Sequence, residues 1–205
     1  VTAALGNAVT MRLYGKGSED LNCHQLLSLT AGLVAVGTVG FRYLDGHRWV
    51  DALYCTGITL TTVGYGDICP ATQSGIMKVF VVALALCGLA VFGALLAFAE
   101  SWRHVLKGYS GSIFPLLAVI FAASAGLFTY LENWTVSDTL YFAVITGTTI
   151  GYGDHEPFQT DGGKIAAVIF ALISINVMSV VTSSIGEKIL AFCGGGSSDV
   201  KDKSD

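Results

Sequence analysis

The 205 residues are 53% hydrophobic and only 13% charged, with a formal net charge of −4. Soluble domains usually carry about twice that share of charged residues, so the composition indicates a membrane protein and excludes a strongly basic nucleic-acid binder. Five cysteines show neither metal-ligand spacing nor a disulfide framework. The sequence contains no nucleotide-binding or EF-hand loop, and we expect neither an enzyme nor a cofactor site.

The chain opens with a polar segment, residues 1–25, to which the sequence assigns no fold. An apolar stretch follows over 26–44, and three more occupy 76–99, 113–131 and 165–185. As helices rising 1.5 Å per residue they would reach roughly 28 to 36 Å, against about 30 Å of hydrocarbon in a bilayer. The sequence therefore predicts four transmembrane helices.

Between the members of each pair of apolar stretches lies a segment too short to cross a membrane. Asp51 and Asp138 are each placed to cap a helix of about ten residues, and each helix would run into a pair of threonines. An extended stretch follows in both places. The pattern predicts two re-entrant pore helices, 51–61 and 138–148, each followed by a loop at membrane depth.

The loops are nearly identical, reading TTVGYGD over 61–67 (the first loop) and TTIGYGD over 148–154 (the second loop). Flanking residues, such as Glu100 and Glu187, repeat at the same offset of 87 residues (154 − 67). Glycine permits a backbone that turns its carbonyl oxygens inward, where they can replace the water shell of a cation. A long period used twice indicates a duplicated membrane module whose halves build one site.

This order, with its doubled loop, resembles the two-pore-domain potassium channels over about residues 26–187. Both loops read Gly-Tyr-Gly, and only residues 45–50 separate the first outer helix from Asp51, which leaves no room for the extracellular helical cap typical of animal members. In these two respects the chain is more similar to plant and algal members. Plant members often carry EF-hands, and these 205 residues contain none.

The resemblance implies an all-α multi-pass membrane protein, built from tandem repeats of outer helix, pore helix, filter and inner helix. It places both termini in the cytosol. The expected regions are an N-terminal segment 1–25, a first pore module 26–99, a cytosolic linker 100–112, a second pore module 113–187 and a disordered tail 188–205. Four filter strands are needed, so it implies a homodimer with pseudo-fourfold symmetry, surrounded by lipid.

In such a pore the backbone carbonyls of both loops would form the K+ sites, with bound K+ ions as the expected ligands. The carbonyls would come from Thr62, Val63, Gly64, Tyr65, Gly66, Thr149, Ile150, Gly151, Tyr152 and Gly153. The pore helices would aim the negative ends of their dipoles at the ion. Asp67 and Asp154 would add negative charge at the outer mouth. That these glycines serve only as turn residues is disfavoured by the duplication.

Behind each loop the sequence leaves two alternatives open. Some potassium channels hold the filter aspartate with a buried glutamate, but Ile58 and Ile145 occupy that position here. Tyr54 and Tyr141 stand where relatives place an aromatic donor. Their hydroxyl groups either hold the aspartates of the loops, or their rings serve only for packing.

Three further sites each allow two interpretations. His155 follows the second loop and either couples external pH to it or is a solvated loop histidine. Asn176, an amide in an apolar helix, either lines a water-filled vestibule or bonds between helices. Glu100 and Glu187 end the inner helices and either concentrate cations at the inner entrance or are solvated at the interface.

The functions that remain belong to three classes. A potassium-selective leak-type channel fits best; no helix carries regularly spaced arginines, so gating by the filter, lipid or pH is expected rather than by voltage. A potassium transporter of pore-loop architecture would need four repeats. A non-conducting or regulatory membrane subunit is the third. Plasma membrane, vacuole and plastid all remain open.

Replacing both Glu100 and Glu187 with glutamine is expected to lower single-channel conductance at low salt if the carboxylates face the pore. The reason is that a ring of negative charge concentrates cations at the entrance. Single-channel recording measures the effect, and an unchanged conductance would support interfacial solvation instead.

Overall fold

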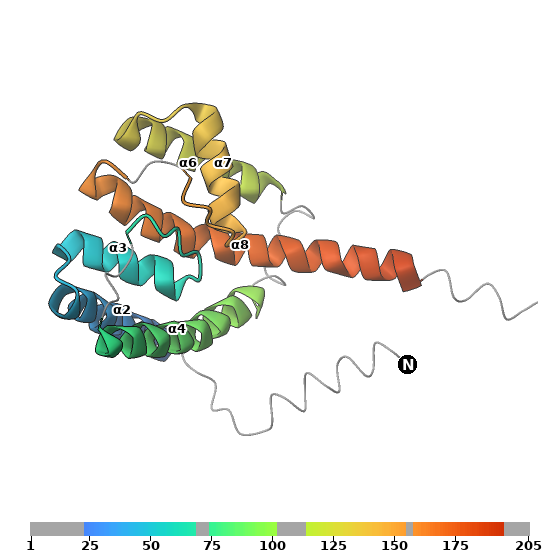
Figure 1. Ribbon diagram of the computed structural model, residues 1–205. Helices are drawn as coiled ribbons and strands as arrows, with labels where there is room; N and C mark the ends of the chain where they lie inside the picture. Colours follow the sequence, from blue (N-terminus) through green and yellow to red (C-terminus); the bar gives the residue numbers. More distant parts are fainter. Residues whose placement is uncertain (1–22, 69–73, 102–113, 155–157, 195–205) are drawn as a thin grey trace, which may run out of the picture.

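The computed structural model describes residues 23–68, 74–101, 114–154 and 158–194, shown as coloured ribbon in Figure 1. Within these ranges the chain forms helices and no strand. The helices are α2 (Cys23–Leu44), α3 (Trp49–Leu60), α4 (Gly75–Ser101), α6 (Phe114–Glu132), α7 (Val136–Gly147) and α8 (Asp161–Gly194). The sequence of long, short and long helix occurs twice, which confirms the predicted all-α tandem arrangement.

Three helices are long and apolar enough to cross a membrane alone, over His24–Leu44, Gly75–Ala97 and Asp161–Cys193. Two further segments, Leu117–Glu132 and Val136–Gly147, pass the same test as a pair, and they are bent by 117° at the break between them. A bend of this size is that of a broken span or a re-entrant loop. The described helices thus supply up to four crossings.

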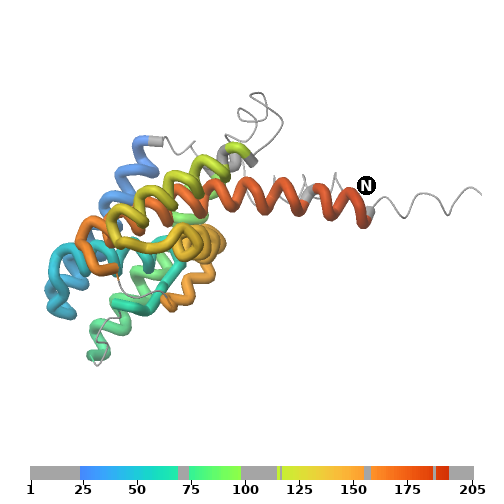
Figure 2. Tube along the Cα trace, turned by 90° about the horizontal axis from the view of Figure 1, so that it is seen from above, coloured from blue at the N-terminus to red at the C-terminus, as the bar shows by residue number. Residues whose placement is uncertain are grey.

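The helix α8 is the element that joins the two halves. It packs against α6 and α7 of its own half and also against α3 and α4 of the other half. Figures 1 and 2 show that its C-terminal end projects well beyond the other helices. The segment 188–194, which we expected to belong to a disordered tail, forms the last part of this helix. Its residues favour a helix, since no glycine or proline occurs between Gly186 and Gly194.

Close packing between the halves depends on a glycine in the pore helix α3. A Cβ atom added to Gly57 would lie about 2.5 Å from Val168 Cγ1 of α8, which is closer than two carbon atoms can approach. Small residues of this kind let helix backbones come together in membrane proteins, where packing rather than the hydrophobic effect holds helices. Gly57 thus sets how closely α8 can lie against the first pore helix.

The predicted caps of the pore helices are wrong in detail. The helices begin at Trp49 and Val136, so Asp51 and Asp138 lie in the first turn and not at the cap. Arg48 is the N-cap of α3 and makes no side-chain cap bond. In α7, Thr135 is the N-cap and forms a reciprocal capping box with Asp138. A first-turn aspartate favours a helix through the dipole, so the sequence signal for a helix start was correct but its register was not.

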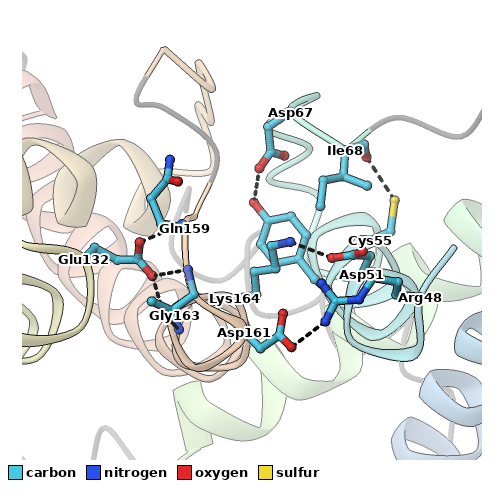
Figure 3. Close-up of polar contacts among 12 residues, drawn as sticks. Arg48, Asp51, Cys55, Asp67, Ile68, Glu132, Gln159, Asp161, Gly163 and Lys164 are labelled. Atoms are coloured by element: carbon cyan, nitrogen blue, oxygen red, sulfur yellow. Dashed lines mark hydrogen bonds and ion pairs between the residues drawn. The ribbon is translucent and has the colours of Figure 1, made fainter.

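A buried carboxylate joins the end of α6 to the start of α8. Glu132 is 7% exposed and accepts hydrogen bonds from Gln159 N at 2.8 Å, Thr160 N at 3.2 Å and Thr160 Oγ1 at 2.6 Å (Figure 3). A buried charge needs such partners, since leaving it unpaired costs several kcal/mol. Glu132 therefore fixes where α8 begins relative to α6.

Replacing Glu132 with glutamine is expected to lower the free energy of unfolding by about 2 kcal/mol, because the amide turns a donor toward groups that also donate. Unfolding in detergent micelles measures the loss. Asp161→Asn is the matched control: its carboxylate is 47% exposed, so its ion pair should contribute no more than about 1 kcal/mol. Equal stability of the two variants would contradict this account of Glu132.

Candidate functional site

The two repeated loops follow the same unusual backbone path. Every second residue lies in the left-handed region, with φ values of 60°, 56° and 77° at Thr62, Gly64 and Gly66. The second loop repeats this with 58°, 53° and 63° at Thr149, Gly151 and Gly153. Because residues of positive φ alternate with residues of negative φ, successive carbonyl groups are expected to turn toward one side of the loop instead of to opposite sides.

Glycine is the residue that such a path requires, and the two threonines are the exceptions. A residue with a side chain adopts this conformation at a cost of order 1–3 kcal/mol. Apart from Asn133, the threonines Thr62 and Thr149 are the described non-glycine residues with positive φ. Strain of this kind is typical of functional sites, where the surrounding structure holds it.

The start of each loop is tied back to the pore helix that precedes it. Gly64 N donates to Ile58 O at 3.1 Å, and Ile150 N donates to Ile145 O at 3.0 Å. Ile58 and Ile145 occupy the positions at which some potassium channels carry a buried glutamate. They contribute through the backbone carbonyl, which any residue type supplies.

The two loops lie against one another. A Cβ atom added to Gly151 would collide with the carbonyl oxygen of Val63, and one added to Gly153 would collide with the carbonyl oxygen of Tyr65. The carbonyl oxygens of the first loop thus face the backbone of the second. In the second loop glycine is required by space as well as by φ.

At the C-terminal end of each loop a tyrosine contacts the aspartate. Tyr54 donates its hydroxyl to Asp67 Oδ2 at 2.8 Å, and Tyr141 donates to Asp154 Oδ2 at 2.6 Å. Figure 3 shows Asp67 turned toward its partner. The structure thus brings together both pairs for which the sequence left hydroxyl bonding and packing open.

An aromatic cluster lies behind the first loop. Tyr65 points away from the loop, and its hydroxyl shares a hydrogen bond of 2.5 Å with Thr146 Oγ1 of α7. Its ring stacks on Tyr54 and Phe142, with ring centroids 6.4 and 5.8 Å apart, and Phe158 contacts it edge-on. Sequence reasoning missed Thr146 and the phenylalanines, since apolar residues in a pore helix carry no signal beyond packing.

The second loop lacks the cover that the first one has. Val63 and Tyr65 are 4% and 9% exposed, whereas their repeat equivalents Ile150 and Tyr152 are 48% and 66% exposed. The first pore helix packs on α8, but in the described residues α7 makes no comparable contact with α4, the equivalent helix. One chain therefore completes the surroundings of one loop only.

Among the remaining predicted site residues, only the side chain of Asn176 is described by the structure. His155 lies outside the described residues. Asn176 donates its amide to Leu172 O at 2.5 Å, within its own helix. Glu100 and Glu187 lie in α4 and α8, but their side chains are outside the described set.

Two ion pairs were missed by sequence reasoning. Lys164 of α8 contacts Asp51 of α3, and Arg48, just before α3, contacts Asp161 of α8. Each pair joins residues 113 apart in sequence. A spacing of 113 residues corresponds to no sequence motif, and neither pair recurs at the repeat offset of 87 residues. The sequence therefore gave no indication of these ion pairs.

Comparison with known proteins places these features among ion channels. A family profile described as "Ion channel" matches residues 28–102 and 115–191. Mouse "Potassium channel subfamily K member 10" is 32% identical over 201 residues, covering 82% of this chain and 37% of the relative. Human "Potassium channel subfamily K member 2" is 29% identical over 198 residues, covering 82% and 46%. Rice "Two pore potassium channel b" is 28% identical over 184 residues, covering 74% and 51%.

The chain spans between about a third and a half of the length of these curated relatives. Animal and plant relatives match at similar identity. Because these sequence identities are so similar, they do not show whether the chain belongs with the plant and algal members, as its loop pattern favours, or with the animal members.

Replacing Tyr54 and Tyr141 together with phenylalanine is expected to reduce the K+ current that the sequence predicts for this protein. Each replacement removes a hydrogen bond to a charged group, which contributes about 1.5–3 kcal/mol to the position of the aspartate. Currents from equal amounts of folded protein in planar bilayers measure the effect. Tyr43→Phe is the control, because Tyr43 is 73% exposed and keeps its ring; a double variant with the control's current would discard a role for the hydroxyl groups.

Proposed function

Since the chain belongs to the two-pore-domain potassium-channel family, we propose that it is a potassium-selective ion channel whose pore is built by two copies. The observation that carries the proposal is that every second residue of both loops has a positive φ, a backbone path that would aim carbonyl oxygens at a common space. These oxygens would replace the hydration shell of K+ as the ion leaves water.

The K+ sites would be formed by the loop carbonyls, from Thr62 to Gly66 and from Thr149 to Gly153. The threonine hydroxyl groups would complete the innermost site. Asp67 and Asp154, fixed by Tyr54 and Tyr141, would place negative charge at the outer mouth. No chemical step is required of the protein, because conduction needs only that binding be favourable enough to admit the ion and weak enough to release it.

A dimer follows from the number of loops. A filter of this type uses four strands, and each chain supplies two. The uncovered second loop fits this requirement, since Ile150 and Tyr152 would be buried by another copy placed around a closed twofold axis. By the repeat offset, the equivalent of Thr146 is Thr59 (146 − 87), so Tyr152 would reach Thr59 of the second copy.

Gating is proposed to be of the leak type, set by the filter, by lipid or by pH at His155. The termini and the linker 100–112 would lie in the cytosol. Two other functions would use the same fold. A non-conducting or regulatory membrane subunit would form the dimer without passing current, and a pore-loop transporter would show no channel-like currents.

Replacing Tyr152 with alanine is expected to weaken the dimer about tenfold or more, as truncation of a buried aromatic side chain at an interface commonly does. The dimer fraction at several protein concentrations, measured by native mass spectrometry, gives the dissociation constant. Tyr130→Ala is the matched control, because Tyr130 is 83% exposed and lies on α6, away from the loops. A Tyr152 variant that dimerises as tightly as the control would contradict this interface.

Conduction itself is tested by the reversal potential of purified protein in planar bilayers, first under asymmetric KCl and then with K+ opposed to Na+. The proposal predicts reversal near the K+ equilibrium potential in both. Silence from folded dimers would favour the non-conducting subunit, and currents that do not distinguish Na+ from K+ would contradict the filter assignment.

A further inference from the structure

The outer end of α3 is held against α8 by an ion pair that is largely shielded from solvent. Lys164 Nζ lies 2.6 Å from Asp51 Oδ1, and the two side chains are only 12% and 15% exposed. Figure 3 shows Lys164 reaching from α8 to Asp51, beside the pair formed by Arg48 and Asp161. Breaking a shielded pair by removing one partner is strongly unfavourable, because the other charge is left without compensation.

The ion pair lies one helical turn from the contact that fixes the first loop. Asp51 is in the first turn of α3, and Tyr54 follows three residues later with its hydroxyl on Asp67. The ring of Tyr54 also packs against Phe158, which precedes α8, at 5.7 Å between centroids. The N-terminal half of α3 is therefore contacted both by a charge at the start of α8 and by the ring of Phe158 just before that helix.

The equivalent junction of the second loop has a different chemistry. By the repeat offset, Lys164 corresponds to Met77 and Asp161 to Ser74 (164 − 87 and 161 − 87), so neither charge on the inner helix is repeated. The close contact of Gly57 with Val168 likewise corresponds to Val144 and Val81. In the proposed dimer, this second junction forms between copies. It keeps an aspartate, Asp138, at the position equivalent to Asp51, but the uncharged Met77 would stand opposite it, and Val144 takes the place of Gly57.

We propose that Asp51 and Lys164 are positioning residues for the first loop, which fix its outer end against α8 and so maintain its selectivity for K+. The pair acts through α3, Tyr54 and Asp67 and does not touch the ion. The inference rests on the proposed channel function. According to this proposal, the ion pair within one chain positions the first loop, whereas the contact between the two copies positions the second loop.

The test uses Lys164→Met, which installs the residue found at the equivalent position 77, and Asp51→Asn, which is nearly isosteric. Each is expected to lower the K+ over Na+ permeability ratio roughly tenfold, the order of effect that contacting charged residues commonly show. The double variant Asp51→Lys with Lys164→Asp should restore most of the ratio. Arg48→Gln is the matched control at the same junction, since its ion pair is exposed (65% and 47%) and should leave the ratio unchanged.

The readout is the reversal potential with K+ opposed to Na+, on protein first shown to be dimeric. Dimeric Lys164→Met or Asp51→Asn protein with the wild-type ratio would overturn the inference. So would a lowered ratio that the reversed pair fails to restore, because the loss would then not come from the pair. If Lys164→Met does not assemble, Asp51→Asn alone decides. A wild-type protein without K+-selective current would count against the proposed function instead.

Discussion

The proposed pore depends on one constraint, which is that each loop must aim successive carbonyl oxygens to the same side. An extended strand of ordinary residues turns them to alternate sides, so every second residue has to be left-handed. Glycine meets this at Gly64, Gly66, Gly151 and Gly153, while the left-handed threonines are strained. Two pore helices, an aromatic cluster and the tyrosine–aspartate contacts surround these loops. Together these contacts hold the loop backbone in its strained conformation of alternating positive φ.

The repeat made most of this predictable from sequence. The loops, the order of helices and the tyrosines behind the loops all recur at one offset, so each copy served as a check on the other. What the repeat did not contain could not be predicted. Glu132 and the pair of Lys164 with Asp51 join residues far apart in the chain, and their contacts depend on how the helices pack. The error over the helix caps has a different cause: aspartate is favoured both at the cap and in the first turn, so its presence does not fix the register.

The two halves are alike in backbone and unlike in surroundings. The first loop is covered by its own chain, with Tyr65 buried, whereas Tyr152 of the second loop is 66% exposed. In the proposed dimer the site of a single chain is incomplete at the second loop. A second copy would supply that surface by symmetry. The ion pair of Lys164 with Asp51 lies near the first loop, which its own chain covers.

In the proposed channel, the carbonyl oxygens of both loops, from two copies, surround K+. The most direct test is the anomalous scattering of Tl+, a K+ substitute, in crystals of the purified protein. The account predicts Tl+ positions on a twofold axis, in line between the loops 61–67 and 148–154 of two copies. Two loop pairs that face away from each other, or Tl+ found only outside the loops, would contradict it.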